Sequence, residues 1–262
     1  MNPGDLDVYK LLKRLHLPTV ARLLASYDAR GAAEGWSHRD FLALLMAEEV
    51  AHRNDTRIAK ASRGAHFPYL KTIEEFDFVF QSSLRRQQLG PYLGPEFVTE
   101  GRNLILSGRP GRGKTHLAIA LAYKAIQNGF HARFITASDL IDELSTASAK
   151  GQLREATAVY VEPNVLVIDE VGYLHHAQDA ANVLYGVVDK RCLKRRPIVF
   201  TTNKALSSWG AVLHDRELAE ALLDRVLEHG AHLKLGGPSY RTRNSDAADL
   251  PLAEDPVERP EE

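Results

Sequence analysis

The stretch LILSGRPGRGKTHLA, residues 104–118, decides the fold class, because it contains the complete motif G-x-x-x-x-G-K-[ST]. An apolar segment precedes the glycines, and a helix-forming segment follows them. The glycines allow backbone N–H groups to turn inward and form a nest for phosphate oxygens. The N-terminus of the following helix adds partial positive charge. The stretch therefore predicts a strand, a phosphate-binding loop and a helix, in that order.

Side chains of the same stretch complete the predicted phosphate site. Lys114 is expected to reach the β- and γ-phosphates of a nucleotide, and the Thr115 hydroxyl is a candidate ligand for Mg²⁺. Arg109 and Arg112 could meet phosphate, meet acids of a neighbour or face solvent, and we favour solvent. The residues expected to form the nucleotide-binding loop are Gly108, Arg109, Pro110, Gly111, Arg112, Gly113, Lys114, Thr115 and His116.

A second apolar segment, NVLVIDE at residues 164–170, ends in two acids. Asp169 can hold Mg²⁺ through its water shell. Glu170 lies beside it, where a carboxylate can polarise the water that attacks a γ-phosphate. A core strand can end in two acids by chance, but its place downstream of the phosphate loop favours a hydrolytic pair.

A third apolar segment, PIVFTTN at residues 197–203, ends in Asn203. The carboxyl ends of parallel strands meet at one edge of a sheet, where ligands bind. Asn203 is therefore expected beside the acid pair, where it can orient the attacking water or sense the γ-phosphate. An asparagine in an ordinary turn is the alternative.

The rest of the chain is organised around this predicted sheet. Strands alternate with helices over residues 101–243, which predicts an α/β fold with a five-stranded parallel sheet flanked by helices. Residues 1–64 predict a small all-helical domain, with a break at the GAAEG of residues 31–35. Residues 65–100 are expected to be a turn-rich connector with an extended segment over 76–80, and the acidic residues 244–262 to be disordered.

The net charge of −1 hides an uneven distribution, with 0 over residues 1–100, +5 over residues 101–243 and −6 over residues 244–262. A basic body with an acidic tail is compatible with a nucleic-acid partner. A solvated helix end, or cations that complement a helix C-terminus, explain the basic clusters equally well. The candidate DNA contacts are Arg53, Arg57, Lys60, Arg63, Lys190, Arg191, Lys194, Arg195 and Arg196.

The cellular compartment follows from simple absences in the sequence. A single cysteine, Cys192, excludes an intramolecular disulfide and fits a reducing cytoplasm. The N-terminal residues carry acids and no continuous apolar run, so they do not resemble a secretory signal. No apolar run approaches the length needed to span a bilayer. We therefore expect a cytoplasmic protein without a membrane partner.

Five segments of the sequence carry a resemblance to a known family: SGRPGRGKTHLA, VLVIDEVGYL, VFTTN, LLDRV and GGPSYRTR. Through these segments the sequence resembles the IstB-type helper ATPases of bacterial insertion sequences. These AAA+ proteins are related to the DnaC-type helicase loaders. The resemblance covers roughly residues 5–243 and implies an AAA+ P-loop fold, ATP and Mg²⁺ as cofactors, and ATP hydrolysis at subunit junctions. It also implies a homo-oligomer, either a ring or a helical filament, that binds duplex DNA and recruits or activates a transposase. The loop arginines and the acidic tail depart from the usual pattern.

The resemblance also suggests roles for arginines near the C-terminus. Arg225 lies at the seam of a predicted helix, where only Glu228 offers a local partner. By resemblance it is an arginine finger that reaches a neighbouring subunit's γ-phosphate, and a helix-surface ion pair is the alternative. Arg241 resembles the second sensor, which contacts nucleotide within the subunit, and Arg243 is the fallback for that role.

Three other functions share parts of this pattern. A replicative helicase loader has the same ATPase core, and only the resemblance of IDEVGYL and the overall length favour the transposition helper. A small-molecule kinase would not need Glu170 to activate water, and no substrate pocket or lid is evident. A DNA-binding module with an inactive nucleotide site is disfavoured by the intact Lys114, Thr115, Asp169 and Glu170.

Overall fold

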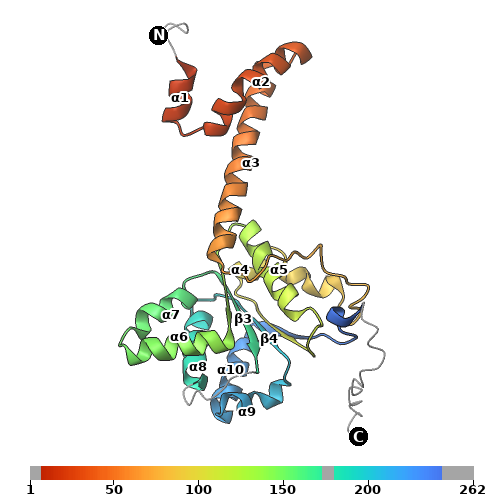
Figure 1. Cartoon of the computed structure of the whole chain (residues 1–262), viewed down its shortest axis with the longest axis vertical. Helices are drawn as coiled ribbons and strands as arrows, with labels where there is room; N and C mark the ends of the chain where they lie inside the picture. The colour runs from red at the N-terminus through yellow and green to blue at the C-terminus, as the bar shows by residue number, and fades with distance from the viewer. Residues whose placement is uncertain (1–6, 173–179, 244–262) are drawn as a thin grey trace. The chain divides into compact units, whose positions relative to one another are not determined.

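The computed structural model describes residues 7–172 and 180–243. The chain divides into two compact units, Met1–Gly64 and Ala65–Glu262. Figure 1 shows both units, the first in red to orange and the second in yellow to blue. The predicted disordered tail at 244–262 lies outside the described residues.

In its described residues, 7–64, the first unit contains three helices, as the sequence predicts: α1 Val8–Arg14, α2 Pro18–Glu34 and α3 His38–Gly64. Its core gathers around Leu12, Val20 and Leu45. The break expected at residues 31–35 begins too early, because α2 continues through Gly31 to Glu34, and Gly35 forms its left-handed C-cap. A glycine suits position 31 of this helix because the Trp36 ring packs so closely that an added Cβ would lie 3.2 Å from it.

The N-terminus of α2 is capped by an acid from another helix. The carboxylate of Glu49, on α3, accepts hydrogen bonds from the N–H groups of Thr19 at 2.9 Å and Val20 at 3.2 Å. Glu49 also pairs with Arg53, whose guanidinium donates to the His16 carbonyl. Burial alone would raise the pKa of Glu49, but the bonds from Arg53 and the two N–H groups outweigh it, so the pKa is lowered.

We expect Glu49→Ala to lower the melting temperature of the first unit by about 5 °C at pH 7, because it removes a helix cap. Since the folded-state pKa of Glu49 lies below the unfolded one, its stabilisation is complete above the unfolded pKa. That stabilisation is lost as the pH falls through the folded-state pKa. The variant and the wild type should therefore converge only at a pH below the folded-state pKa, which is lower than the ordinary glutamate value. Thermal melts of the full chain followed by circular dichroism, with Asp55→Ala at an exposed acid of the same helix as control, measure this. Identical melting of Glu49→Ala and wild type at pH 7 would rule out the capping role.

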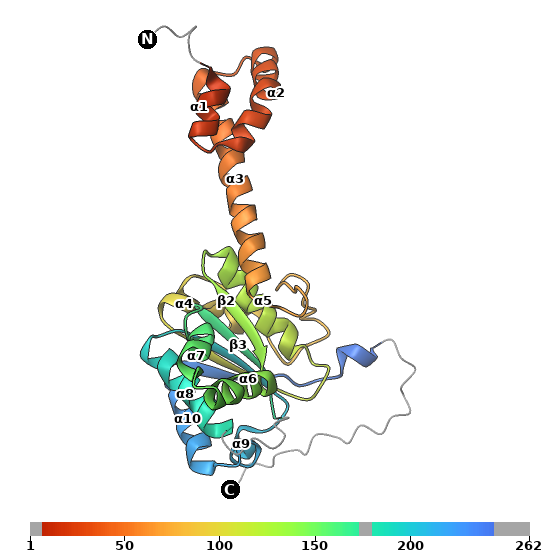
Figure 2. The same cartoon turned by 60° about the vertical axis from the view of Figure 1, so that its left-hand side comes forward.

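The second unit is built on a five-stranded parallel sheet in the order β2-β3-β4-β1-β5, which confirms the predicted α/β architecture. Figure 2 shows the sheet with helices around it. The strands are β1 Asn103–Ser107, β2 Ala132–Thr136, β3 Val165–Val171, β4 Ile198–Thr202 and β5 Gly230–Lys234. The helices are α5 Lys114–Gln127, α6 Ala137–Ala149, α7 Leu153–Val161, α8 Ala180–Leu193, α9 Trp209–Leu213 and α10 Arg216–Glu228.

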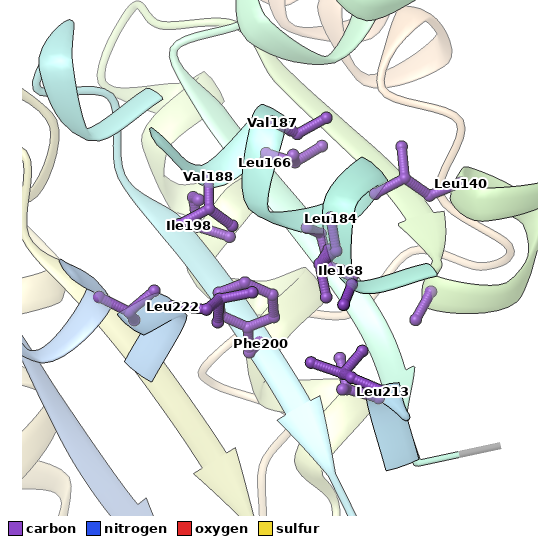
Figure 3. Packing of buried hydrophobic residues seen from close by; sticks show 14 of the residues in the cluster. Leu140, Leu166, Ile168, Leu184, Val187, Val188, Ile198, Phe200, Leu213 and Leu222 are labelled. Atoms are coloured by element: carbon purple, nitrogen blue, oxygen red, sulfur yellow. The ribbon is translucent and has the colours of Figure 1, made fainter. Parts of the chain in front are cut away.

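One face of this sheet carries a large apolar core. Ile168 of β3 and Phe200 of β4 point to the same side, where they meet Leu184 of α8 and Leu222 of α10 (Figure 3). All four side chains are fully buried. The opposite face is covered by α5, whose residues from Leu117 to Ala122 are almost completely buried. Burial on both faces explains why the central strands read as continuous apolar runs.

The residues expected to form a separate connector, 65–100, belong to the second unit. They include a 3₁₀ helix, η2 Arg86–Tyr92, and the short helix α4 Glu96–Thr99, and they bury Leu89 and Phe97 completely. The extended segment expected over 76–80 is wrong. The Asp77 carboxylate accepts hydrogen bonds from the N–H groups of Val79 and Phe80 and folds this segment into a turn. We call residues 65–84 the strap.

No helix in the described ranges is long and apolar enough to cross a bilayer.

Candidate nucleotide-binding site

A cavity of about 610 Å³ lies at the carboxyl edge of the sheet. It is lined by the phosphate loop, by the ends of β3 and β4, by the strap and by the C-terminal segment that follows β5. The structure thereby brings the three sequence signatures together at one site. The predicted site residues that line the cavity are Pro110, Gly111, Arg112, Gly113, Lys114, Thr115, His116, Glu170, Asn203 and Arg241.

The phosphate loop has a backbone shape that requires glycine. Gly111 and Gly113 have φ values of 78° and 85°, in the left-handed region. A Cβ at Gly113 would lie 2.6 Å from the Phe76 ring. Helix α5 begins directly after Gly113, and a glycine has no side chain with which to cap it. The first N–H groups of α5 are therefore open to an anionic ligand.

The Lys114 side chain reaches from the start of α5 back across the loop to the residues that follow β1. Its ammonium group donates hydrogen bonds to the carbonyls of Gly108 at 2.7 Å and Arg109 at 3.0 Å. Burial lowers the pKa of Lys114, and the negative charge of Asp169 opposes that shift. An ammonium group in this half-buried position can exchange its two carbonyl partners for phosphate oxygens.

A hydroxyl and a carboxylate meet beside the loop. Thr115 Oγ1 lies 2.9 and 3.1 Å from the two carboxylate oxygens of Asp169. Thr201, which the sequence analysis did not single out, donates to Asp169 at 2.5 Å. Burial raises the pKa of Asp169, although the bonds from Thr201 and Thr115 oppose this. Hard oxygen donors that converge on one point fit Mg²⁺, so these residues suit the predicted cation.

Glu170 is turned out of the core by a local irregularity of its strand. Its φ of 59° is unusual for a residue with a side chain, and the pairing of β3 with β4 shifts register between Ile168 and Val171. The Glu170 N–H is held by Thr201 Oγ1 at 3.0 Å. The side chain is consequently exposed at the cavity, while its strand neighbours are buried. Asn203 follows β4 directly and lines the same cavity.

The strap forms a wall of the cavity that the sequence analysis missed. His116 does not point along the phosphate loop but donates from Nε2 to the carbonyl of Thr72 at 2.9 Å. The rings of Phe80 and Tyr240 meet edge to face at 5.4 Å. The alternating phenylalanines at 76, 78 and 80 are the signal in the sequence for this wall, although their alternation favours an extended segment. The strap residues that line the cavity are Tyr69, Lys71, Glu75, Phe76, Asp77, Phe80 and Gln81.

The loop arginines do not face solvent as expected. Arg109 and Arg112 are both half-buried. Arg112 lines the cavity and donates to the carbonyl of Leu235 at 3.3 Å, whereas Arg109 does not line it. Arg241 lines the cavity, but the guanidinium of Arg243 stacks on the Tyr240 ring at 3.8 Å and lies outside the lining. Of the two candidates for the second sensor, Arg241 therefore has the suitable position.

Arg225 has a partner that its own helix did not reveal. Its Nη2 lies 3.4 Å from Asp189 Oδ1 on α8. A hydrogen bond with Tyr185 and the charge of Asp189 raise the pKa of Arg225. Asp189 lies on another helix, so Glu228 remains the local partner that the sequence predicts within α10. Arg225 does not line the cavity of its own chain.

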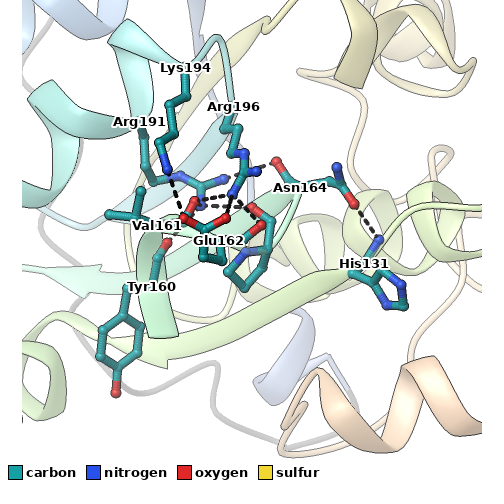
Figure 4. A network of polar contacts seen from close by, with 9 residues as sticks. His131, Tyr160, Val161, Glu162, Asn164, Arg191, Lys194 and Arg196 are labelled. Carbon is teal, nitrogen blue, oxygen red and sulfur yellow. Dashed lines mark hydrogen bonds and ion pairs between the residues drawn. The ribbon is translucent and has the colours of Figure 1, made fainter. Parts of the chain in front are cut away.

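One candidate DNA contact, Arg191, is excluded by burial. Its guanidinium is completely buried and donates to five backbone carbonyls before β3 and β4: Tyr160, Val161, Pro163, Asn164 and Pro197. Figure 4 shows Arg191 with Tyr160, Val161 and Asn164, which precede β3. Burial lowers the pKa of Arg191 to about 9. The Arg191 guanidinium thus holds together the chain segments that precede β3 and β4.

The other basic candidates fall into two groups. Lys194 and Arg196 both pair with Glu162, at 2.7 and 2.9 Å. Arg53 is engaged in the first unit with Glu49, and Arg57 donates to Asn54 at 2.9 Å. Four candidates are exposed and form no ion pair with an acid within the part of the chain that the structure describes: Lys60, Arg63, Lys190 and Arg195.

A phosphate loop before α5, an acid pair at β3 and a polar residue after β4, on a sheet of this order, define a P-loop protein of the AAA+ class. The chain belongs to the family of IstB-like ATP binding proteins, whose model matches residues 10–248. The resemblance drawn from the sequence is therefore confirmed.

Individual relatives agree with this family. The chain is 36% identical over 236 residues to "Insertion sequence IS5376 putative ATP-binding protein" of Geobacillus stearothermophilus, covering 90% of this chain and 94% of the relative. It is 33% identical over 240 residues to "Insertion sequence IS21 putative ATP-binding protein" of Pseudomonas aeruginosa, covering 92% and 90%. The crystal structure of the DnaC helicase loader superposes with a TM-score of 0.50 at 24% identity, over 68% of this chain and 99% of that chain. At this identity, the likeness to DnaC concerns the fold alone.

Proposed function

We propose that this protein is an ATP-dependent transposition helper. It hydrolyses ATP at the junctions between its own subunits, assembles on duplex DNA, and recruits or activates the transposase of the same insertion sequence. The observation that supports this most strongly is the single cavity at which Lys114, Glu170, Asn203 and Arg241 meet, in a chain of the IstB-like family. The names of the relatives support the link to insertion sequences.

The proposed chemistry places the phosphates and Mg²⁺ in one part of the cavity and the nucleotide base in another. Lys114 and the N–H groups of the loop bind the β- and γ-phosphates, while Thr115 and Asp169 would hold Mg²⁺, which neutralises phosphate charge when bound. Glu170 accepts a proton from the attacking water, and Asn203 orients that water. The aromatic wall of Phe76, Phe80 and Tyr240 offers an apolar surface for the base. Arg241 contacts the phosphates from within the subunit.

DNA binding would rest mainly on phosphate contacts and so would weaken steeply as salt rises. The exposed cations Lys60, Arg63, Lys190 and Arg195 are the remaining candidates for it. A replicative helicase loader is the second candidate function, because the DnaC loader shares the fold. Pull-downs with the insertion-sequence transposase and with the host replicative helicase separate the two functions, since only the true partner should be retained in an ATP-dependent way.

Replacing Lys114 with alanine tests the nucleotide site itself. We expect the variant to bind ATP roughly 100-fold more weakly or worse, since removing the partner of a bound charge costs about 2–5 kcal/mol. Titration with a fluorescent ATP analogue measures this. Lys124→Ala, at the other end of α5, is the matched control and should bind normally. Wild-type affinity in Lys114→Ala would remove the loop from nucleotide binding.

A further inference from the structure

Two consecutive carbonyl groups of the phosphate loop are held by donors from elsewhere in the chain. The N–H of Tyr240 donates to the carbonyl of Gly111 at 2.8 Å. The side-chain amide of Gln81, in the strap, donates from Nε2 to the carbonyl of Arg112 at 3.0 Å. Both bonds bridge segments that lie far apart in the sequence.

These bonds control the direction of N–H groups. In a trans peptide the carbonyl of one residue and the N–H of the next point in opposite directions. Holding the Arg112 carbonyl therefore also sets the direction of the Gly113 N–H. Gly113 forms one side of this peptide and Gly111 precedes Arg112, and glycine offers little resistance to rotation. Without an anchor, this part of the loop would have to be ordered when phosphate binds, which weakens binding.

Gln81 is itself held in one orientation. Only 3% of it is exposed. Its amide oxygen accepts the hydroxyl of Ser83 at 2.9 Å, and the Ser83 oxygen accepts the N–H of Gly236 at 2.8 Å. A carbonyl can only accept, so the amide nitrogen must face Arg112. The three bonds form one directed chain, in which neighbouring bonds strengthen each other.

We infer that Gln81 is a positioning residue for phosphate binding, which sets the Arg112–Gly113 peptide through its bond to the Arg112 carbonyl. This inference rests on the proposed function, because it assigns a role within the same nucleotide site. Through Ser83 and Gly236, Gln81 also ties the loop to the segment that carries Arg241. By linkage, a nucleotide that orders the loop stabilises the strap.

The near-isosteric Gln81→Met removes the amide donor and tests this inference. We expect ATP and ADP to bind about tenfold more weakly, the effect of losing one buried hydrogen bond. We expect kcat at saturating ATP to stay within about twofold, because the catalytic groups are untouched. Isothermal titration and steady-state turnover measure both quantities. Gln87→Met, at an exposed glutamine of η2 just after the strap, is the matched control and should behave as wild type.

Proteolysis gives a readout that a merely structural role would not change. Arg85 and Arg86 are exposed trypsin sites just after the strap. Saturating ATP should slow cleavage there in wild type and in Gln87→Met, but not in Gln81→Met. If Gln81→Met does not fold, Ser83→Ala is tested in its place. This substitution removes the hydrogen bond that fixes the Gln81 amide, and it should weaken ATP binding by about threefold.

The outcomes separate the two proposals. Wild-type affinity together with wild-type protection in Gln81→Met, or in Ser83→Ala where the first variant does not fold, overturns the role of Gln81. A wild-type protein that binds no ATP overturns the proposed function instead. Weakened binding with lost protection in the variant, and normal behaviour in the control, supports both.

Discussion

Arg225→Ala is expected to bind ATP with wild-type affinity and to hydrolyse it roughly 10³-fold or more slowly, the effect of losing an arginine finger. The structure explains why binding should survive, because Arg225 does not line the cavity of its own chain. Its side chain is 42% exposed and is held by Asp189 of α8 at 3.4 Å. Exposed pairs of this kind are weak, so a neighbour's phosphate can compete for the guanidinium.

Mixing variants tests whether the finger acts in trans. In a mixture of Arg225→Ala with Lys114→Ala, some junctions combine an intact cavity from the first variant with an intact Arg225 from the second. We expect these junctions to restore part of the ATP turnover, which a phosphate-release assay measures across mixing ratios. Arg216→Ala, an exposed arginine of the same helix, is the control and should turn over normally. No recovery at any ratio would count against a finger in trans.

Glu170→Gln is expected to lower ATP turnover by about 10²–10⁴-fold while leaving ATP binding intact, because glutamine keeps the shape but cannot accept the proton of the attacking water. The backbone at this position is held by Thr201 and should not change. The variant should also accumulate as a DNA-bound oligomer, since hydrolysis is proposed to release it. Turnover assays and cosedimentation with duplex DNA measure both effects. Wild-type turnover would remove Glu170 from catalysis.

The parts of the site that the sequence predicted correctly are those with local physical requirements. The phosphate loop needs glycines at fixed positions beside a helix N-terminus, and Gly111 and Gly113 occupy the left-handed region accordingly. Glu170 and Asn203 lie at the carboxyl ends of β3 and β4, and parallel strands deliver these ends to the same edge. Such features can be predicted from a single window of residues.

The parts that the sequence did not predict depend on distant contacts. A helical wheel compares a residue with neighbours three and four positions away, so it could not pair Arg225 with Asp189 on another helix. Arg191 looked like one of several surface cations, but only the fold places it among five buried carbonyls. The strap could not be joined to the cavity because Gln81 and Arg112 are 31 positions apart.

The central claim is that ATP is hydrolysed between subunits assembled on DNA. The most direct test measures ATP turnover per subunit across a range of protein concentrations, with and without duplex DNA. We predict that turnover per subunit rises with concentration and that DNA shifts this rise to lower concentrations. A turnover per subunit that stays constant down to concentrations at which sedimentation shows only monomers, and that ignores DNA, would contradict the account.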